Sequence, residues 1–345
     1  MRFIIHIGPR KTGTTYLQSA LYQCKEPMAQ EGIFYYIDPP VAGRPRVQRS
    51  LLGAALEQGR AAALMPDFYA ARDQGMHTVV ISDERLSQLD ASKLAPLQAM
   101  VTELAAGDPV TVVTYCRRWS DRLPSLWAEI IKHGRTQNFA EWLVQMLLQN
   151  QQNPDIYEAA MWSAWQSLFG EDCLKIVSYD VMMAQKVDIA REFLDSFIGW
   201  PGVIPPRAKK SVNQRLSASE VELLRLLNIM SAKEGVAISE RARLNLLRDL
   251  AAAKDTRFKS LGEAGGPMVR VDDRSAFFDR ARTAMQAIAD SSLIPRNGDA
   301  RLMVPAVTNT QLSQPGFFSD RTLVEALHDA YGQLRAIQTG FGEAA

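Results

Sequence analysis

The sequence is poor in the residues that mark several common classes of protein. It has three cysteines in 345 residues (Cys24, Cys116 and Cys173) and four histidines. The cysteines are odd in number, widely spaced and without metal-ligand spacing, which favours buried, reduced thiols in a reducing compartment. Lysine and arginine (39) nearly balance aspartate and glutamate (38), and the net charge is +1. A basic field for nucleic acid is therefore missing, and no nucleic-acid partner is expected.

Long apolar segments are also missing. No stretch approaches the roughly 20 residues of a membrane-spanning helix. The apolar run near the N-terminus, residues 3–7, is too short for the core of a signal peptide. Hydrophobic residues make up 47% of the chain, which is enough for a sizeable core. These features predict a soluble, cytoplasmic protein without a transmembrane segment, and they leave its oligomeric state open.

The most informative stretch is a short strand, a glycine-containing turn and a helix in direct succession near the N-terminus. Residues 3–7 are apolar except for one histidine, residues 8–13 contain two glycines and a proline, and residues 14–21 have apolar side chains at helical spacing. Turn amides and the positive end of the helix dipole favour an anion, and Thr14 and Thr15 can add hydroxyl donors. The stretch therefore predicts a phosphate-binding loop.

The position of the cation narrows the class of this loop. A nucleotide triphosphatase loop reads Gly, four residues, Gly-Lys-Ser/Thr, with the lysine directly after the second glycine. Gly8 and Gly13 keep that spacing, but Thr14 stands where the lysine should be. The cation lies inside the loop instead, as Lys11.

The segment Lys-Thr-Gly-Thr-Thr at residues 11–15 resembles the 5′-phosphosulfate loop of the sulfotransferases that use 3′-phosphoadenosine 5′-phosphosulfate (PAPS), in its bacterial and Golgi-type form. The resemblance implies sulfuryl transfer from PAPS to a hydroxyl or amine, release of adenosine 3′,5′-bisphosphate and no metal. Lys11 would neutralise the leaving group. Tyr16 stands where cytosolic members place a tryptophan for adenine. The implied cofactor contacts in this stretch are Arg10, Lys11, Thr12, Gly13, Thr14, Thr15 and Tyr16.

A second pair of residues follows the clearest strand of the sequence, the β-branched run 110–116. Arg117 comes directly after this run, and Ser125 follows eight residues later in a predicted helix. Sulfotransferases bind the 3′-phosphate of the cofactor with an arginine at a strand end and a serine eight residues on. The resemblance therefore assigns this role to Arg117 and Ser125, with Arg118 as the alternate, and the planar guanidinium suits phosphate oxygens. Taken alone, the spacing also fits a solvated arginine and a helix-surface serine.

Sulfuryl transfer to a hydroxyl needs a base that removes the proton of the acceptor. The strand predicted at 78–81 is followed by Asp83 and Glu84, and no histidine lies in the segment beyond it. Some bacterial and Golgi-type members use a glutamate near this point, so we expect Glu84 to be the base, with Asp83 and then His133 as alternatives. A structural role for Glu84 is equally compatible, because an acid in the first turn of a helix complements its dipole. His6 is expected to pack in the core.

Strands that alternate with helices organise the first 200 residues. This alternation predicts an α/β fold with a parallel sheet of P-loop type flanked by helices, and ligands at the carboxyl ends of the strands. Besides the first strand, we expect strands at 32–36, 78–81, 110–116 and 174–178. We expect helices at 50–74, 92–106, 122–132, 139–149, 155–169 and 187–198.

The chain changes character near residue 200. We predict two consecutive domains: residues 1–200 form the PAPS-binding core, and residues 201–345 form a helical region that packs on the core and shapes the acceptor site. The basic loop 207–215 contains Arg215, which is expected to contact the cofactor in place of the Arg-Lys-Gly-x-x-Gly loop that this sequence lacks. The expected helices of this region are at about 217–232, 239–253, 275–289 and 320–338.

Two other functions stay open at this point. A P-loop kinase or nucleotide-binding ATPase would use a similar loop, but it predicts a lysine after Gly13, which is absent. A non-catalytic binding module could keep the fold, but it would be expected to have lost Lys11, Arg117 or Ser125, which are all present. The acceptor is not determined, because acceptor contacts come from variable loops. A glycan, a lipid and a small metabolite all fit.

Overall fold

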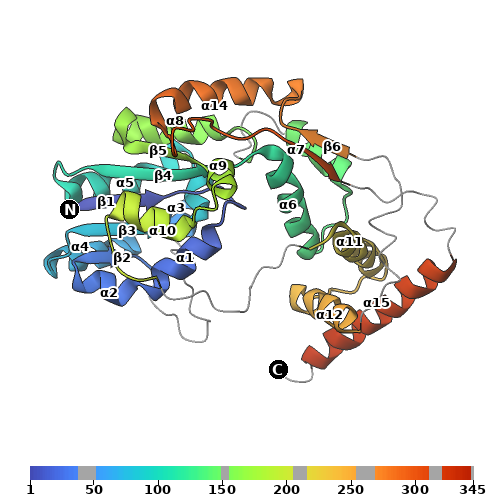
Figure 1. Ribbon diagram of the computed structural model, residues 1–345. Coiled ribbons are helices and arrows are strands. Elements are labelled where there is room, and N and C mark those ends of the chain that lie inside the picture. The colour runs from blue at the N-terminus through green and yellow to red at the C-terminus, as the bar shows by residue number, and fades with distance from the viewer. Residues whose placement is uncertain (38–51, 149–154, 205–215, 254–268, 311–320, 343–345) are drawn as a thin grey trace. The chain divides into compact units, whose positions relative to one another are not determined.

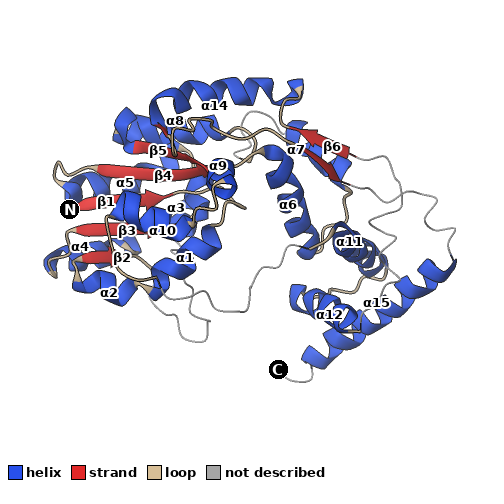
Figure 2. Cartoon of the chain, in the orientation of Figure 1, coloured by secondary structure: helices blue, strands red, loops and turns tan. Residues whose placement is uncertain are grey.

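The computed structural model describes residues 1–37, 52–148, 155–204, 216–253, 269–310 and 321–342. The protein is an α/β protein with a six-stranded parallel sheet flanked by helices, and a separate pair of antiparallel strands (Figures 1 and 2). Its contacts divide the chain into two compact units. One unit comprises residues 1–118, 149–209 and 274–305, and the other comprises residues 119–148, 210–273 and 306–345.

The parallel sheet belongs to the first unit and has the strand order β2–β3–β1–β4–β5–β7. Its main strands are apolar, β-branched runs that are buried on both faces, as expected for a parallel sheet covered by helices. The central strand β1 pairs with β3 and with β4, and its last residue His6 lies opposite Ser82 of β3. The strands are β1 (Arg2–His6), β2 (Ile33–Tyr35), β3 (Thr78–Ser82), β4 (Val110–Cys116), β5 (Leu174–Ser178) and β7 (Leu293–Ile294).

Helices cover both faces of this sheet. On one face, a core cluster joins five neighbouring strands to the helices α1 (Thr14–Gln23), α2 (Lys25–Gln30), α9 (Tyr179–Ala184) and α10 (Ile189–Phe193). On the other face, α5 (Ala91–Ala105) contacts β1, while α8 (Glu158–Phe169) and α14 (Asp279–Ser292) contact β5. The remaining elements of this unit are α3 (Leu52–Glu57), α4 (Met65–Asp73), the short helices η1 (Ala61–Ala63), η2 (Glu84–Gln88), η3 (Glu171–Cys173) and η5 (Ala276–Phe278), and the π-helix η4 (Leu194–Ile198).

The second unit is mainly helical. The helix α6 contacts α11 and α12, and α15 contacts both of these. The start of α6 is tied to the antiparallel strands, because the buried carboxylate of Asp273 accepts hydrogen bonds from the amide (2.8 Å) and hydroxyl (2.6 Å) of Ser120 and from the amide of Ala306 (2.9 Å). Its elements are α6 (Trp119–Lys132), α7 (Phe139–Leu148), α11 (Ala218–Lys233), α12 (Glu240–Ala252), β6 (Val269–Asp272), β8 (Val307–Thr310) and α15 (Arg321–Gly342).

The two units do not follow the single boundary near residue 200 that the sequence predicted. Residues 119–148 belong to the mainly helical unit, and residues 274–305 belong to the unit with the parallel sheet. The region expected to be helical also contributes three strands: β7, which pairs with β5, and the antiparallel pair β6–β8. Because β7 has two residues and β6 and β8 have four each, these strands are too short to give a clear alternating pattern.

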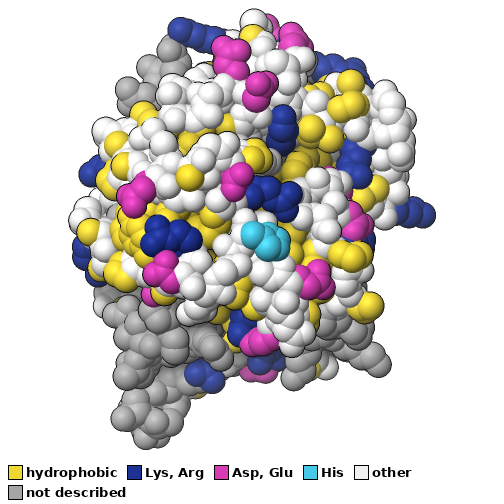
Figure 3. All heavy atoms as spheres, turned by 90° about the vertical axis from the view of Figure 1, so that its left-hand side faces the viewer, with side chains coloured by type: hydrophobic (Ala, Val, Ile, Leu, Met, Phe, Trp, Pro, Cys, Tyr) yellow, Lys and Arg dark blue, Asp and Glu magenta, His cyan; other side chains and the backbone are white. Residues whose placement is uncertain are grey.

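Two expectations about buried side chains are confirmed. The three cysteines are buried free thiols, and His6 is buried in the core. Within the described ranges, no helix is both long and apolar enough to cross a membrane. Figure 3 views the side on which the strands of the parallel sheet begin, where apolar, basic and acidic side chains are interspersed. The residues of interest for function lie at the opposite ends of the strands.

Candidate functional site

The order of the strands creates a switch point between β1 and β4. From β1 the chain continues to β2 and β3 on one side of the sheet, and from β4 it continues to β5 on the other side. At such a point the loops after the two neighbouring strands diverge and leave a crevice at the carboxyl ends, which is where ligands of open α/β sheets bind. The loop 8–13 follows β1, and Arg117 follows β4. The topology therefore brings two of the predicted motifs to one place.

The loop after β1 has a tightly folded backbone. Lys11 and Gly13 adopt left-handed conformations, with φ of 71° and 84°. Lysine rarely adopts this conformation, and the strain of a non-glycine residue there is a feature of functional sites. The hydroxyl of Thr12 donates to the carbonyl of Pro9 (2.7 Å) and so closes the loop on itself. Thr12, expected to contact the cofactor, thus has its hydroxyl proton committed within the loop.

The helix α1 starts without a cap of its own. Its N-cap residue is Gly13, no side-chain cap is present among the described residues, and no acidic residue lies in the first turn. The hydroxyl of Thr14 is buried and has no hydrogen-bond partner among the described residues, while Thr15 is exposed. Unsatisfied amides and the positive end of the helix dipole attract an anion. The start of α1 therefore has the properties of an anion site.

His6 lies directly beneath this loop. A Cβ atom on Gly8 would lie 2.4 Å from His6 Nε2, so only glycine fits above the ring. His6 Nδ1 lies 2.8 Å from the hydroxyl oxygen of Ser82. Burial lowers the pKa of His6 to about 3, because the charged imidazolium would lose its hydration. The ring is therefore neutral at physiological pH.

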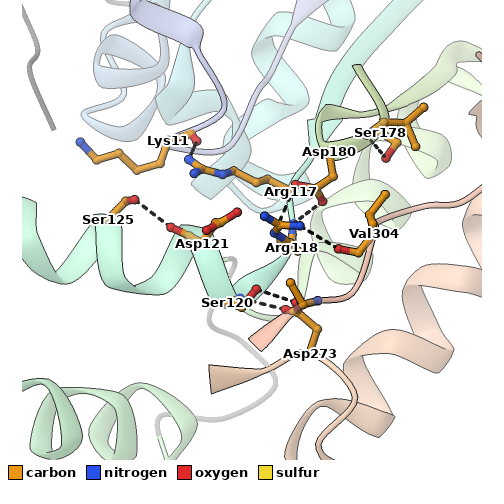
Figure 4. Close-up of polar contacts among 12 residues, drawn as sticks. Lys11, Arg117, Arg118, Ser120, Asp121, Ser125, Ser178, Asp180, Asp273 and Val304 are labelled. Carbon is orange, nitrogen blue, oxygen red and sulfur yellow. Dashed lines mark hydrogen bonds and ion pairs between the residues drawn. The ribbon is translucent and has the colours of Figure 1, made fainter. Parts of the chain in front are cut away.

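Arg117 contacts the loop from the neighbouring strand. Its Nη1 donates to the carbonyl oxygen of Lys11 (2.5 Å), and its guanidinium lies over the ring of Tyr179 at 5.1 Å from the centroid. Arg117 Nε is buried and has no hydrogen-bond partner among the described residues. Figure 4 shows the carbonyl of Lys11 facing Arg117 while the ammonium group extends away from it. The carbonyl of Lys11 is thus paired with Arg117, which removes one backbone oxygen that would repel an anion.

The neighbouring Arg118, the alternate for the same role, is held differently. Its amide donates to the buried carboxylate of Asp180 (2.8 Å), its Nε lies 3.9 Å from the same carboxylate, and its Nη1 donates to the carbonyl of Val304 (3.3 Å) (Figure 4). These contacts join β4, α9 and the segment after β7. Arg118 has a structural role here, which makes Arg117 the better candidate for a ligand.

Ser125 belongs to the second unit, whereas Arg117 belongs to the first. The hydroxyl of Ser125 donates to the carbonyl of Asp121 (2.8 Å), four residues earlier in α6 (Figure 4). Its joint action with Arg117 on one phosphate therefore stays a prediction.

The acidic pair after β3 divides into two environments. Asp83 is 3% exposed, and its carboxylate accepts hydrogen bonds from the amides of Arg85 (2.9 Å) and Gly53 (2.7 Å), so that it caps η2. Glu84 is the first residue of η2 and is partly exposed. Both carboxylate oxygens of Asp83 are thus engaged by backbone amides. Of the two residues, Glu84 is the better candidate for a base.

Two further residues of the site have acidic partners that no sequence motif indicated. The guanidinium of Arg10 forms an ion pair with Asp155, and the hydroxyl of Tyr16 donates to Asp188. Tyr179, whose ring lies under the guanidinium of Arg117, was not among the residues predicted from the sequence. A polar or aromatic residue directly after a predicted strand was the only signal for Tyr179, whereas Asp155 and Asp188 come from distant loops.

The two remaining candidates are not in this group. His133 follows α6 in the second unit, and its imidazole lies 3.1 Å from Glu240 and 3.8 Å from Glu129. Its side chain is 54% exposed. Arg215 lies outside the described residues.

Comparisons with protein-family models, with curated proteins and with solved structures find no match for this chain.

Proposed function

We propose that the protein is a sulfotransferase that moves a sulfuryl group from PAPS to a hydroxyl or amine of a glycan, a lipid or a small metabolite. The observation that carries the proposal is the start of α1. Among the described residues it has no side-chain cap, no acid in its first turn and no hydrogen-bond partner for the buried Thr14 hydroxyl, and the cation is Lys11 within the loop. These features suit a phosphate, and the threonine after Gly13 disfavours the kinase arrangement.

The residues present fit the 5′-phosphate end of such a nucleotide. The amides at the start of α1 and the hydroxyls of Thr14 and Thr15 would hold the 5′-phosphate, above a Gly8 whose missing side chain keeps the loop close to His6. Arg117 would hold the 3′-phosphate together with Ser125, and Tyr16 lies on the helix that follows the loop. When bound, PAPS supplies the sulfuryl group.

The roles of the protein side chains in the transfer follow from charge. Glu84 would take the proton of the acceptor as its oxygen or nitrogen forms a bond to sulfur. Lys11 would stabilise the negative charge that would grow on the bridging phosphate oxygen as its bond to sulfur breaks. The reaction leaves the sulfated acceptor, adenosine 3′,5′-bisphosphate and a protonated glutamate, which returns its proton to solvent. Neither side chain needs a metal ion for its role.

Calorimetry with the full chain tests the proposal. Adenosine 3′,5′-bisphosphate should bind at least tenfold more tightly than 5′-AMP, because a charge-assisted contact to the 3′-phosphate contributes about 1.5–3 kcal/mol. Arg117→Ala should remove most of this difference. Arg72→Ala, on the exposed surface of α4, is the matched control and should leave it unchanged. Equal affinity for the two nucleotides would reject the assignment.

A second measurement separates the alternatives. Sulfuryl transfer should continue in the presence of EDTA. If a chelator abolishes turnover and magnesium restores it, or if ATP binds more tightly than adenosine 3′,5′-bisphosphate, the site belongs to a kinase or ATPase. Tight binding of adenosine 3′,5′-bisphosphate without transfer to any of a panel of hydroxyl and amine acceptors would favour a non-catalytic binding module.

A further inference from the structure

The imidazole of His6 is a buried polar group that the proposed mechanism does not use. It is 1% exposed at the end of β1, and its Nε2 has no hydrogen-bond partner among the described residues. A buried nitrogen without a partner is destabilising, whereas an apolar side chain of similar size would fill the same space without this penalty. The position therefore calls for a role beyond packing.

The ring is held in one orientation under the loop. Its Nδ1 lies 2.8 Å from the hydroxyl of Ser82, and the rings of Tyr115 and Phe193 contact it edge to face, with centroids at 5.6 and 5.8 Å. These contacts place Nε2 against Gly8, where a Cβ atom would lie only 2.4 Å away. His6 Nε2 is thus held beneath Gly8, the first residue of the loop.

The same ring connects the loop to the end of β3. Ser82 lies directly opposite His6 in the sheet, and the backbone carbonyl of His6 accepts the amide of Asp83 (3.1 Å). The carbonyl of Ser82 accepts a hydrogen bond from Gln18 Nε2 of α1 (3.2 Å). The His6 ring is therefore connected to the loop, to α1 and to the strand β3 that precedes Glu84.

We propose that His6 is a positioning residue for the loop 8–13: its Nε2 forms a hydrogen bond with the loop when an anion is bound there, and Ser82 keeps the ring in the required orientation. The identity of the anion rests on the proposed function, but the role of the ring requires only that the loop binds an anion. The lowered pKa of His6 fits this role, because a neutral ring can exchange hydrogen bonds without gaining charge.

Nuclear magnetic resonance on the full chain with ¹⁵N-labelled histidine tests the hydrogen bond directly. Inorganic phosphate, and separately adenosine 3′,5′-bisphosphate, are titrated into the wild-type protein. The Nε2 resonance of His6 should shift with saturation, while the resonances of exposed His77 should not. A His6 Nε2 resonance that stays unchanged when the phosphate site is saturated would overturn the proposal.

Two conservative variants identify the nitrogen that acts. His6→Asn keeps a polar group near Ser82 but has no atom at Nε2, whereas His6→Gln extends to that position. We expect His6→Asn to weaken phosphate binding about three- to tenfold, the effect of one hydrogen bond, and His6→Gln to recover part of the loss. His77→Asn is the control and should bind phosphate like the wild type.

An apolar variant separates positioning from core packing. His6→Leu should keep or raise the midpoint of thermal unfolding and still lose about three- to tenfold in phosphate affinity. A change in thermal midpoint with unaltered phosphate affinity would show that His6 only packs the core, and if His6→Leu fails to fold, the Asn and Gln pair decides. Binding of phosphate but not of adenosine 3′,5′-bisphosphate by the wild type would reject the proposed function alone. Binding of neither would overturn both.

Discussion

Three helices start at the same edge of the sheet, and they differ in whether a side chain caps their first backbone amides. After β3, η2 starts at Asp83, whose carboxylate accepts the amide of Arg85, and Glu84 lies in its first turn. After β5, α9 starts at Ser178, whose hydroxyl accepts the amide of Val181, and an acid again lies in the first turn. After β1, α1 starts at Gly13 with neither device.

The difference shows where a ligand is expected. A side-chain cap satisfies the first amides of a helix, and an acid in the first turn neutralises the positive end of its dipole. A start that lacks both leaves amides and partial positive charge for a bound anion, provided that the cost to stability is tolerated. The helix starts after β3 and β5, which have a cap and an acid, are called closed below. They are the comparison for the uncapped start of α1 after β1.

The strongest test concerns Glu84, which is either the base or an acid that complements the dipole of η2. If it is the base, Glu84→Gln should lower turnover by about 10²–10⁴ and leave the affinity for adenosine 3′,5′-bisphosphate intact. Steady-state kinetics and calorimetry on the same samples measure both. A variant with unchanged turnover and a small loss of stability would assign Glu84 to the dipole alone, and the base would then be sought at Asp83 and His133.

Lys11 lies in the loop before the uncapped helix start and should act on charge that develops during the transfer. Lys11→Ala should lower turnover by about 10²–10³, with a smaller loss of nucleotide affinity because the amides and Thr14 remain. Lys25→Ala on α2 is a control at a distance from the loop. A loss confined to affinity, with turnover at saturation unchanged, would contradict this role.

The buried, neutral His6 at the end of β1 should make the protein less stable at acidic pH. The pKa of His6 is lowered to about 3 in the folded state, whereas an unfolded histidine titrates near 6.5. Between these values the unfolded state binds one more proton, so stability falls as the pH is lowered from about 6.5 towards 3, by about 1.4 kcal/mol per pH unit for this group. Denaturant unfolding at several pH values measures how the free energy of unfolding depends on pH. Between pH values of about 6.5 and 3 this free energy should fall less steeply in His6→Leu, by the contribution of one proton. Equal slopes in the two proteins would show that the ring is already protonated in the fold.

A substitution at the exposed Thr15 can add the acid that the first turn of α1 lacks. Thr15→Glu adds the missing acid and should stabilise the helix by about 0.3–1 kcal/mol while it weakens binding of adenosine 3′,5′-bisphosphate by at least tenfold through like-charge repulsion. Thr15→Gln has a side chain of the same shape without charge and isolates the electrostatic part. Denaturant unfolding measures the stability and calorimetry measures the binding. If Thr15→Glu binds adenosine 3′,5′-bisphosphate as tightly as Thr15→Gln, the nucleotide does not place a phosphate at the start of α1.

The smallest effect is expected at a closed start. Ser178→Ala removes the cap of α9 and should lower the free energy of unfolding by about 1 kcal/mol. Nucleotide affinity should stay within twofold of the wild type, because this amide is already satisfied within the protein. A loss of affinity that exceeds the loss of stability would mean that α9 takes part in binding, through Tyr179 or Arg117.

The sequence by itself determined the elements that have a strong local signal. The run 110–116 is a strand because β-branched side chains suit an extended, buried backbone, and the loop 8–13 lies between a strand and a helix because its glycines interrupt both patterns. Lys11, Thr14 and Arg117 were expected at one edge of the sheet, because each follows a predicted strand and the carboxyl ends of parallel strands lie together. Their expected roles came from the family resemblance.

Only the tertiary structure decided which polar groups are paired. Asp155, Asp180 and Asp188 are ordinary surface residues by sequence, yet they hold Arg10, Arg118 and Tyr16 across the fold. The two-residue strand β7 is defined by its pairing with β5, which no local sequence pattern indicates. The division into two interleaved units likewise arises from contacts between distant segments. A sequence pattern reports on neighbours along the chain, whereas hydrogen-bond partners, sheet edges and burial are set by residues that folding brings together from far apart.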